Sequence, residues 1–158
     1  MTPKLEITYK VANTKKEFDD GQKLFEQYAH LTNLNLSFQD LANEHKMIDK
    51  QYNKPRGALL LAYKDEIAIG CAGIRELDIN TAEGKRMFVC PEYRGYNIGR
   101  KLLELCIDIA KGLNYKKIRL DTLPNMTQAQ KLYHEFGFYK IPSYRFNPIE
   151  GTIYMEKN

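Results

Sequence analysis

Residues 89–100 of this chain combine the residue types that bind a diphosphate. An apolar run ends at Pro91, a loop with Arg94 and two glycines follows, and an apolar-periodic stretch begins at Ile98. Glycine lets backbone N–H groups approach an anion, and the first turn of a helix presents unpaired N–H groups and a positive dipole end. The segment therefore predicts a loop that binds a phosphorylated ligand in front of a helix.

Other phosphate-binding motifs do not fit these residues. A Walker loop needs Gly-Lys-Ser/Thr at the helix start and a dinucleotide fingerprint needs Gly-x-Gly-x-x-Gly, and neither pattern occurs. A plain strand-to-helix turn with no ligand is the alternative that the segment by itself leaves open.

Three motifs together resemble the GNAT superfamily of N-acetyltransferases. The acyl-coenzyme A signature of that family is similar to Arg94-x-x-Asn97-x-Gly99, its thioester-site motif to Ala129-x-x-Leu132-Tyr133-x-x-x-Gly137-Phe138, and its third strand to Gly70-x-x-Gly73. The resemblance covers residues 59–139. It implies one α/β domain over residues 1–158, with a mixed central sheet of about six to seven strands that splays between strands 4 and 5, and about four helices.

The resemblance also implies chemistry and site residues. The expected donor is acetyl-coenzyme A, the expected acceptor is a primary amine of a small molecule or peptide that attacks directly in a ternary complex, and no metal takes part. The cofactor-binding residues that we expect are Phe88, Val89, Arg94, Gly95, Tyr96, Asn97, Ile98, Gly99, Arg100 and Asn125. The family usually has glycine where this chain has Asn97, and asparagine also tolerates a positive φ. Capping of the last helix is the competing role for Asn125.

Tyr133 occupies the position of the family's general acid. A phenol with a pKa of about 10 stays protonated at neutral pH and can donate to a thiolate of pKa about 8.5. A core tyrosine on a helix is the alternative, because Ala129, Leu132 and Phe136 define an apolar side next to it. We expect a backbone N–H near Val89 to stabilise the oxyanion, and Cys90 to be dispensable.

Glu83 is the candidate general base. By period two it shares a strand face with Lys85, Met87 and Val89, which directs it toward the expected cleft. A solvated glutamate at the strand end is the alternative. The cations Lys85, Arg86 and Arg145 favour an acceptor that carries a carboxylate.

Composition limits the classes of protein that fit. The 158 residues carry a net charge of +4 with scattered cations, which argues against nucleic-acid binding and suits an anionic cofactor. No apolar run is long enough to span a bilayer and no signal peptide is evident, so we expect a cytoplasmic protein that does not bind membranes. Cys71, Cys90 and Cys106 read as reduced core thiols, and a homodimer is compatible with the family resemblance.

Periodicity places the elements that position these residues. We expect strands over residues 5–11, 57–63, 67–74, 83–90, 117–120, 138–141 and 152–155, with residues 75–80 either continuing the third strand or leaving it. Helices are expected over residues 38–48, 98–112 and 127–136, and another follows the capping residues Asn13 and Thr14, with an apolar side formed by Phe18, Leu24, Phe25, Tyr28 and Leu31. The segment 64–66 reads as a hairpin turn. Two other functions stay open at this point: a non-catalytic acyl-coenzyme A sensor, and a loop that binds a protein partner.

Overall fold

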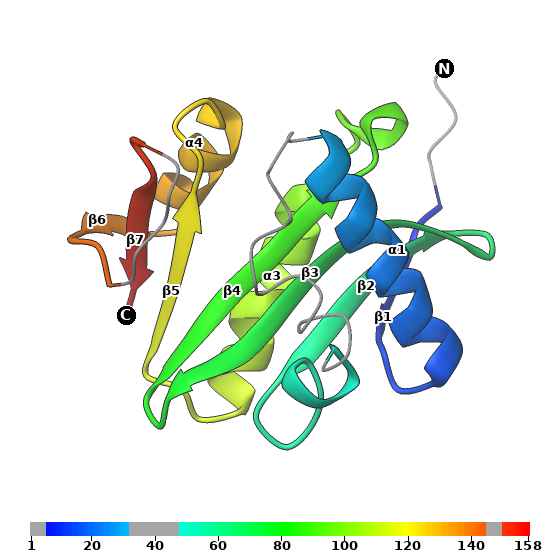
Figure 1. Ribbon diagram of the computed structural model, residues 1–158, viewed down its shortest axis with the longest axis horizontal. Coiled ribbons are helices and arrows are strands. Elements are labelled where there is room, and N and C mark those ends of the chain that lie inside the picture. The colour runs from blue at the N-terminus through cyan, green and yellow to red at the C-terminus, as the bar shows by residue number, and fades with distance from the viewer. Residues whose placement is uncertain (1–5, 32–47, 145–149) are drawn as a thin grey trace.

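The computed structural model describes residues 6–31, 48–144 and 150–158, and it shows a seven-stranded sheet with helices on both faces (Figure 1). In spatial order the strands are β1 (Thr8–Val11), β2 (Ala58–Lys64), β3 (Ile67–Asp78), β4 (Thr81–Val89), β5 (Lys117–Thr122), β7 (Ile153–Lys157) and β6 (Tyr139–Ile141). All neighbouring pairs are antiparallel except β4 and β5, which are parallel. The expected α/β class and mixed sheet are confirmed.

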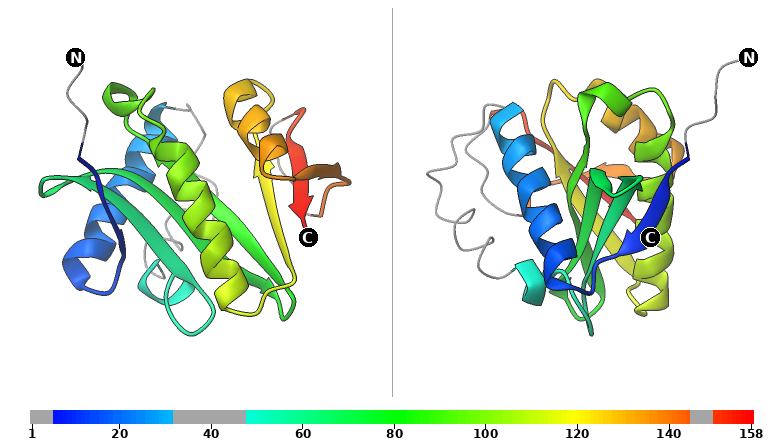
Figure 2. Two further views of the ribbon diagram at one scale, coloured as in Figure 1. Left: turned by 180° about the vertical axis from the view of Figure 1, so that it is seen from behind. Right: turned by 90° about the vertical axis from the view of Figure 1, so that its right-hand side faces the viewer.

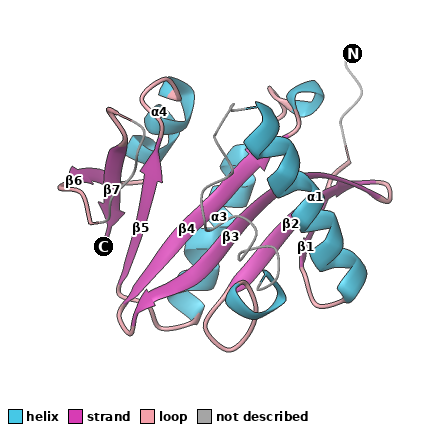
Figure 3. Cartoon of the chain, viewed as in Figure 1, coloured by secondary structure: helices cyan, strands magenta, loops and turns pink. Residues whose placement is uncertain are grey.

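Helices cover both faces of this sheet. α1 (Lys15–Leu31) packs on one face and α3 (Ile98–Gly112) on the other, as the rear and side views show (Figure 2). We call these the α1 face and the α3 face. α4 (Thr127–Glu135) follows β5, residues 48–51 are helical, and the single turn η1 (Pro91–Tyr93) leads from β4 toward α3 (Figure 3). The expected helix over residues 38–48 lies almost entirely outside the described residues.

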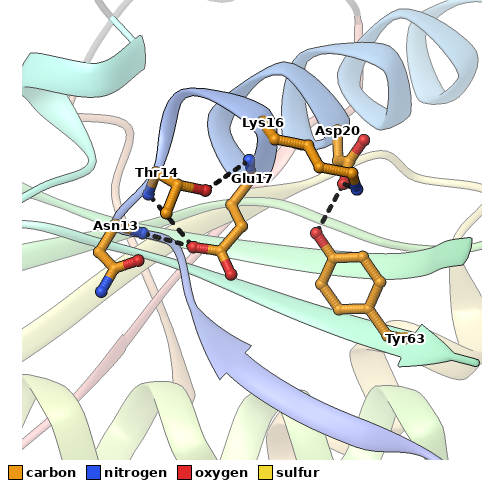
Figure 4. Close-up of polar contacts among 6 residues, drawn as sticks. All are labelled: Asn13, Thr14, Lys16, Glu17, Asp20 and Tyr63. Atoms are coloured by element: carbon orange, nitrogen blue, oxygen red, sulfur yellow. Dashed lines mark hydrogen bonds and ion pairs between the residues drawn. The ribbon is translucent and has the colours of Figure 1, made fainter. Parts of the chain in front are cut away.

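The first helix begins with a reciprocal cap, drawn in Figure 4. Thr14 Oγ1 accepts a hydrogen bond from the N–H of Glu17 at 3.2 Å, and Glu17 Oε1 accepts from the N–H groups of Asn13 and Thr14 at 2.9 and 3.2 Å. These bonds satisfy donors that the helix leaves unpaired, and they lower the pKa of Glu17. Near the same end, Asp20 accepts a 2.7 Å hydrogen bond from Tyr63, which ties α1 to β2.

The core lies between the sheet and its two helix layers. The first six residues of β2 are buried on both faces, and α1 buries Phe18, Leu24 and Phe25 as its pattern predicts. Leu31, also expected on that apolar side, is 50% exposed at the helix end. The hairpin turn is confirmed between β2 and β3, with Asp65 in the left-handed region at φ 56°.

Two strands, β4 and β5, run further than periodicity predicts, and of the two alternatives for residues 75–80 the structure shows continuation of the third strand. β3 extends to Asp78, β4 begins at Thr81 and β5 continues to Thr122, because each gains a paired neighbour at its polar end. α3 ends at Gly112 as expected, but Asn114 is the residue in the left-handed region, at φ 70°. Its N–H donates to Lys111 O and the next N–H donates to Ala110 O, which closes the helix with a Schellman motif.

Candidate active site

The parallel strands β4 and β5 pair only at their beginnings. Cα partners run from Thr81 opposite Lys117 to Glu83 opposite Arg119, and the ribbons diverge beyond that point (Figure 1). Beyond Glu83 and Arg119, the edges of β4 and β5 that face each other are therefore not paired with one another. Open α/β sheets bind ligands beyond the carboxyl ends of strands where neighbouring connections diverge, so this opening is the expected place for a site.

A cleft of about 110 Å³ occupies this opening. Its walls come from β3, β4, β5, α1, α3 and the segment that includes α4. The lining includes Tyr28, Gly84, Lys85, Arg86, Met87, Leu103, Cys106, Ile107, Leu120, Asp121, Thr122, Met126, Ala129 and Tyr133. The helical residues on the α3 face are mostly apolar, whereas the two strands contribute charged and hydroxyl side chains.

The β4 wall carries a β-bulge at Arg86. Register against β3 shifts between the pairs Cys71–Phe88 and Gly73–Lys85, and Arg86 takes φ 58°. Its carbonyl oxygen accepts a 3.2 Å hydrogen bond from the Cys71 thiol, and its guanidinium lies 6.0 Å from the ring centre of Phe25 in α1. A non-glycine residue in this backbone region is strained, and such strain is concentrated at functional sites.

The loop before α3 has the backbone that its sequence predicts. Gly95 takes φ 91° and Asn97 takes φ 62° at the N-cap of α3, where its side chain makes no capping bond. Gly95, Tyr96 and Asn97 are exposed, as are Arg94 and Arg100. The first N–H groups of α3 thus follow directly on an exposed glycine-containing turn, the arrangement that binds anions.

The two arginines expected to bind phosphate both contact other groups of the chain. Arg94 Nε donates to Val89 O at 3.2 Å, which folds the side chain back over the end of β4. Arg100 pairs with Glu135 of α4 and stacks over the Phe136 ring at 5.5 Å. Arg94 keeps its guanidinium at the loop, whereas Arg100 links α3 to α4.

The remaining predicted cofactor residues fall into two groups. Phe88 is buried and packs edge-on against Tyr28 at 5.7 Å, and Ile98 is buried in the core, so each offers the cleft only its backbone or a ring edge. Val89 is half-buried beside Gly99, which leaves room above the helix start. Asn125 is exposed and does not cap α4, whose N-cap is Met126 without a side-chain bond. The capping expectation for Asn125 is wrong.

Tyr133 lies on the inner side of α4 and lines the cleft. It is 7% exposed and its ring packs against Phe138 at 5.7 Å. Burial, reinforced by nearby groups that include Tyr28 and Asp121, raises the pKa of its phenol well above the ordinary value. The hydroxyl is therefore protonated at neutral pH, and the side chain that carries it lines the cleft.

Glu83 is placed differently from its expected role. Its side chain is 0% exposed, Oε1 accepts from Arg75 Nε at 2.9 Å, and Oε2 accepts from the Tyr144 hydroxyl at 2.8 Å. Arg75 in turn donates to Gln51 at 3.2 Å. The carboxylate lies at the last β4–β5 pair, beneath the cleft and outside its lining. The structure thus brings Tyr133 to the cleft but seals Glu83 within a polar network.

Comparison with known proteins identifies this architecture. Residues 25–138 match the model of the acetyltransferase (GNAT) family. The chain belongs to the GNAT acetyltransferase family. An uncharacterised N-acetyltransferase from Schizosaccharomyces pombe is 32% identical over 94% of this chain and 93% of its own. N-acetylaspartate synthetase from Danio rerio is 31% identical over 81% of this chain and 50% of its own.

Solved GNAT structures share the fold over nearly the whole length. An acetyltransferase of the GNAT family from Staphylococcus aureus superposes with a TM-score of 0.80 at 25% identity, covering 97% of this chain and 99% of the other. The PaiA N-acetyltransferase from Thermoplasma acidophilum, solved in complex with coenzyme A, gives a TM-score of 0.72 at 18% identity over 96% and 98% of the two chains. This GNAT chain is accordingly an acyltransferase.

Two polar residues of the GNAT cleft escape the sequence patterns. Asp121 and Thr122 lie on the free end of β5 and both line the cleft. Thr122 is 5% exposed, and its hydroxyl oxygen has no hydrogen-bond partner in the described part of the chain. The expected strand stops at Leu120, one residue before this pair. A usable signal is that polar residues directly after a buried parallel strand lie at the ligand-binding edge of the sheet.

The cysteines behave as the composition predicts. Cys71, Cys90 and Cys106 are free and buried, and burial raises the thiol pKa of each, that of Cys106 to about 12. Such thiols are poor nucleophiles at neutral pH. Within residues 6–31, 48–144 and 150–158, no cluster of potential metal ligands is found, and no helix there is long and apolar enough to cross a membrane.

Proposed function

We propose that this GNAT protein transfers an acetyl group from acetyl-coenzyme A to a primary amine, by direct attack of the amine in a ternary complex. The observation that carries the proposal is the cleft between β4 and β5, which has the glycine turn and the α3 N-terminus beyond one wall and Tyr133 inside. Coenzyme A is bound in the Thermoplasma neighbour, which supports the same donor here.

The diphosphate of the donor is assigned to the loop and helix start. Backbone N–H groups from Gly95 to Gly99 and the guanidinium of Arg94 supply donors and positive charge there. The amide-containing chain of the donor then enters the cleft. We assign a hydrogen bond with it to the Thr122 hydroxyl, because that buried hydroxyl has no hydrogen-bond partner in the described part of the chain and lines the cleft.

The acid step is assigned to Tyr133. As the amine nitrogen forms its bond to the thioester carbon, the carbon–sulfur bond breaks and the thiolate needs a proton. Tyr133 supplies it, and the proton that the nitrogen loses on becoming an amide restores the phenol. Placing a general acid in this way contributes roughly 10²–10⁴ to the rate. Glu83 stays the sequence-predicted base, and an altered acid limb in the pH profile of Glu83→Gln would support that role.

The charges of the cleft favour acceptors that carry a carboxylate. Lys85 and Arg86 both line the β4 wall, whereas Arg145, the third member of the predicted cationic group, lies outside the described residues. The relative from Danio rerio is named for an N-acetylated amino acid that bears carboxylates, which agrees with this class. Equal turnover of amino acids and of their decarboxylated amines would count against it.

The first experiment is thermal unfolding with and without acetyl-coenzyme A. A ligand that binds only the folded state raises the midpoint by mass action, by an amount set by about RT ln(1 + [L]/Kd). No shift at millimolar donor would refute the proposal. A shift then justifies a screen of amines by thiol release.

The sequence by itself leaves open a non-catalytic sensor of acyl-coenzyme A, and membership of the acetyltransferase family argues against it. Tyr133→Phe separates the two functions: an enzyme loses turnover while its thermal shift with coenzyme A persists. A sensor shows no turnover in either form.

A further inference from the structure

We propose that Asp121 contacts the acceptor amine and takes its proton, so that Asp121 rather than Glu83 is the base of the transfer. The inference rests on the proposed acetyl transfer, since it concerns the acceptor side of the same cleft. Two observations carry it. Asp121 lies on the β5 wall of the opening, beyond the last residue of β5 that pairs with β4. Its carboxylate forms no hydrogen bond or ion pair within the described residues.

The position follows from the register of the sheet. Beyond the last β4–β5 pair, Asp121 lies two residues after Arg119 on β5 and therefore shares its strand face, and the Arg119 guanidinium lies over the Tyr144 ring at 5.5 Å. Its cross-strand partner on β7 is Tyr154, and the Tyr154 ring packs edge-on against Tyr144 at 5.2 Å. Asp121 lines the cleft together with Tyr28 of α1 and acts electrostatically on that phenol, so it projects on the α1 face of the opening. Thr122, next along the strand, projects toward the α3 face and the donor.

The two carboxylates at the opening differ in what they can reach. Glu83 is 0% exposed and both of its oxygens accept hydrogen bonds, from Arg75 and from Tyr144. Asp121 is half-buried and lines the cleft. A carboxylate that is partly removed from water without a partner is unfavourable, and an ammonium ligand compensates it. Of these two carboxylates, Asp121 is therefore the one that a ligand can reach and whose burial a ligand would compensate.

Phenols and cations from several elements surround Asp121, whereas α3 and β3 contribute mainly apolar residues to the same cleft. The phenols and cations are Tyr28 of α1, Lys85 and Arg86 of β4, Arg119 of β5 itself, Tyr133 of α4, Tyr154 of β7 and Tyr144 after β6. Burial holds the phenol pKa values of Tyr28, Tyr133 and Tyr144 high, with a smaller contribution from Asp121. The phenols are therefore neutral at pH 7, and Asp121 supplies the carboxylate among the described residues that line the cleft.

The cleft thus has walls of opposite charge. The β4 wall presents Lys85 and Arg86, and the β5 wall presents Asp121. The Tyr28 hydroxyl lies near both, since Arg86 lowers and Asp121 raises its pKa after the larger effect of burial. A zwitterion with one ammonium and one carboxylate matches this pair of walls, whereas a simple alkylamine matches only one of them. The acceptor class is therefore a free amino acid or a similar aminocarboxylate.

The proton balance is complete with Asp121 as base. Its carboxylate accepts one proton from the ammonium, which leaves a neutral amine with a free lone pair. That lone pair forms the N–C bond, the C–S bond breaks, and Tyr133 protonates the thiolate. The second proton leaves the nitrogen as the amide forms and restores Tyr133. Asp121 then releases its proton to water after the product departs.

The test is the pH dependence of kcat/KM for the full chain with acetyl-coenzyme A and the best L-amino acid from the thiol-release screen. We expect Asp121→Asn to lower kcat/KM roughly 10²–10⁴-fold near neutral pH, with the deficit shrinking at high pH as the amine loses its proton in solution. Glu83→Gln should keep the shape of the wild-type profile. Asp108→Asn, which removes an exposed α3 carboxylate outside the cleft, is the matched control and should change nothing.

The outcomes separate this inference from the proposed function. An acid limb lost in Glu83→Gln but kept in Asp121→Asn overturns it. Coenzyme A binding without turnover of any amine also overturns it and leaves the donor site standing. No thermal shift with coenzyme A in the wild-type chain refutes the proposed function itself. Asp121→Glu keeps a carboxylate, so it should retain more activity than Asp121→Asn; equal losses, with coenzyme A binding intact in both, contradict a role as base.

Discussion

Replacement of Thr122 by valine should stabilise the free protein and weaken donor binding. Valine has nearly the shape of threonine, and the Thr122 hydroxyl is buried without a hydrogen-bond partner in the described part of the chain. An unsatisfied buried polar group costs about 1–3 kcal/mol. We therefore expect Thr122→Val to raise the free energy of unfolding by about 1–2 kcal/mol, which corresponds to roughly 2–8 °C in Tm for a chain of this size.

The effect on binding has the opposite sign. If the hydroxyl bonds the donor, its loss removes a net interaction of about 0.5–1.5 kcal/mol and raises the Kd for coenzyme A roughly 2- to 12-fold. Thermal unfolding of the free variant gives the first quantity, and calorimetric titration with coenzyme A gives the second. Opposite signs in one variant distinguish a ligand-binding hydroxyl from a structural one.

Thr81→Val is the matched control. Thr81 is also a buried threonine of the sheet, 3% exposed, but its side chain hydrogen-bonds Asp78. Its replacement should lower stability and leave the Kd for coenzyme A unchanged, because it lies at the paired end of β4. Loss of stability in Thr122→Val would show that the hydroxyl is satisfied in the free protein. An unchanged Kd would show that the donor does not reach it.

Three further substitutions test other parts of the account. Cys90→Ala should keep most of the activity, because the buried thiol has a raised pKa and packs beside Gln27; abolished turnover in a folded variant would show that the thiol takes part. Glu17→Gln should cost about 0.3–1 kcal/mol at pH 7 in urea unfolding, because glutamine can still accept the capping bonds but removes the negative charge from the helix start. Since folding lowers the pKa of Glu17, this contribution is present above the unfolded pKa of about 4.3 and is lost as pH falls through the folded pKa; a difference that persists at pH 3 would contradict it. Asn97→Gly should tighten coenzyme A binding with little change in Tm, since relief at φ 62° offsets the added chain entropy, and weaker binding would assign the amide a contact with the donor.

Local chemistry made much of the fold predictable. The turn at Lys64-Asp65-Glu66 and the capping residue Thr14 each depend on neighbours in sequence, and each is found as expected. The turn at Gly95 and Asn97 belongs to the same class, because positive φ is a property of those residue types.

The composition of the cleft depends on distant pairings, which no local pattern reports. Glu83 bonds residues of its own chain and not a ligand, because Arg75 of β3 and Tyr144 occupy both of its oxygens. Tyr144 lies 61 positions after Glu83 in the sequence. Whether Asp121 reaches the cleft is decided by where β4 and β5 stop pairing, at Glu83 and Arg119. Residue type alone allows either carboxylate to act as a base. The sheet register shows that Glu83 lies at the last β4–β5 pair, whereas Asp121 lies beyond it.

The polar network around Glu83 explains why the sheet can open without coming apart. Beyond Glu83 and Arg119 the two parallel edges exchange no backbone hydrogen bonds, so other contacts must join the halves. Tyr144 supplies one, because its hydroxyl bonds Glu83 of β4 while its ring lies against Arg119 of β5.

Arg119 extends the same network to the far edge of the sheet. It donates to Glu156 of β7 at 2.8 Å, and Glu156 accepts from Tyr139 of β6 at 2.6 Å. Hydrogen bonds to charged groups contribute about 1.5–3 kcal/mol each, more than neutral ones. A carboxylate held in this way fixes the point from which the strands diverge, which is a structural task for Glu83 and leaves proton transfer to a group on the free wall.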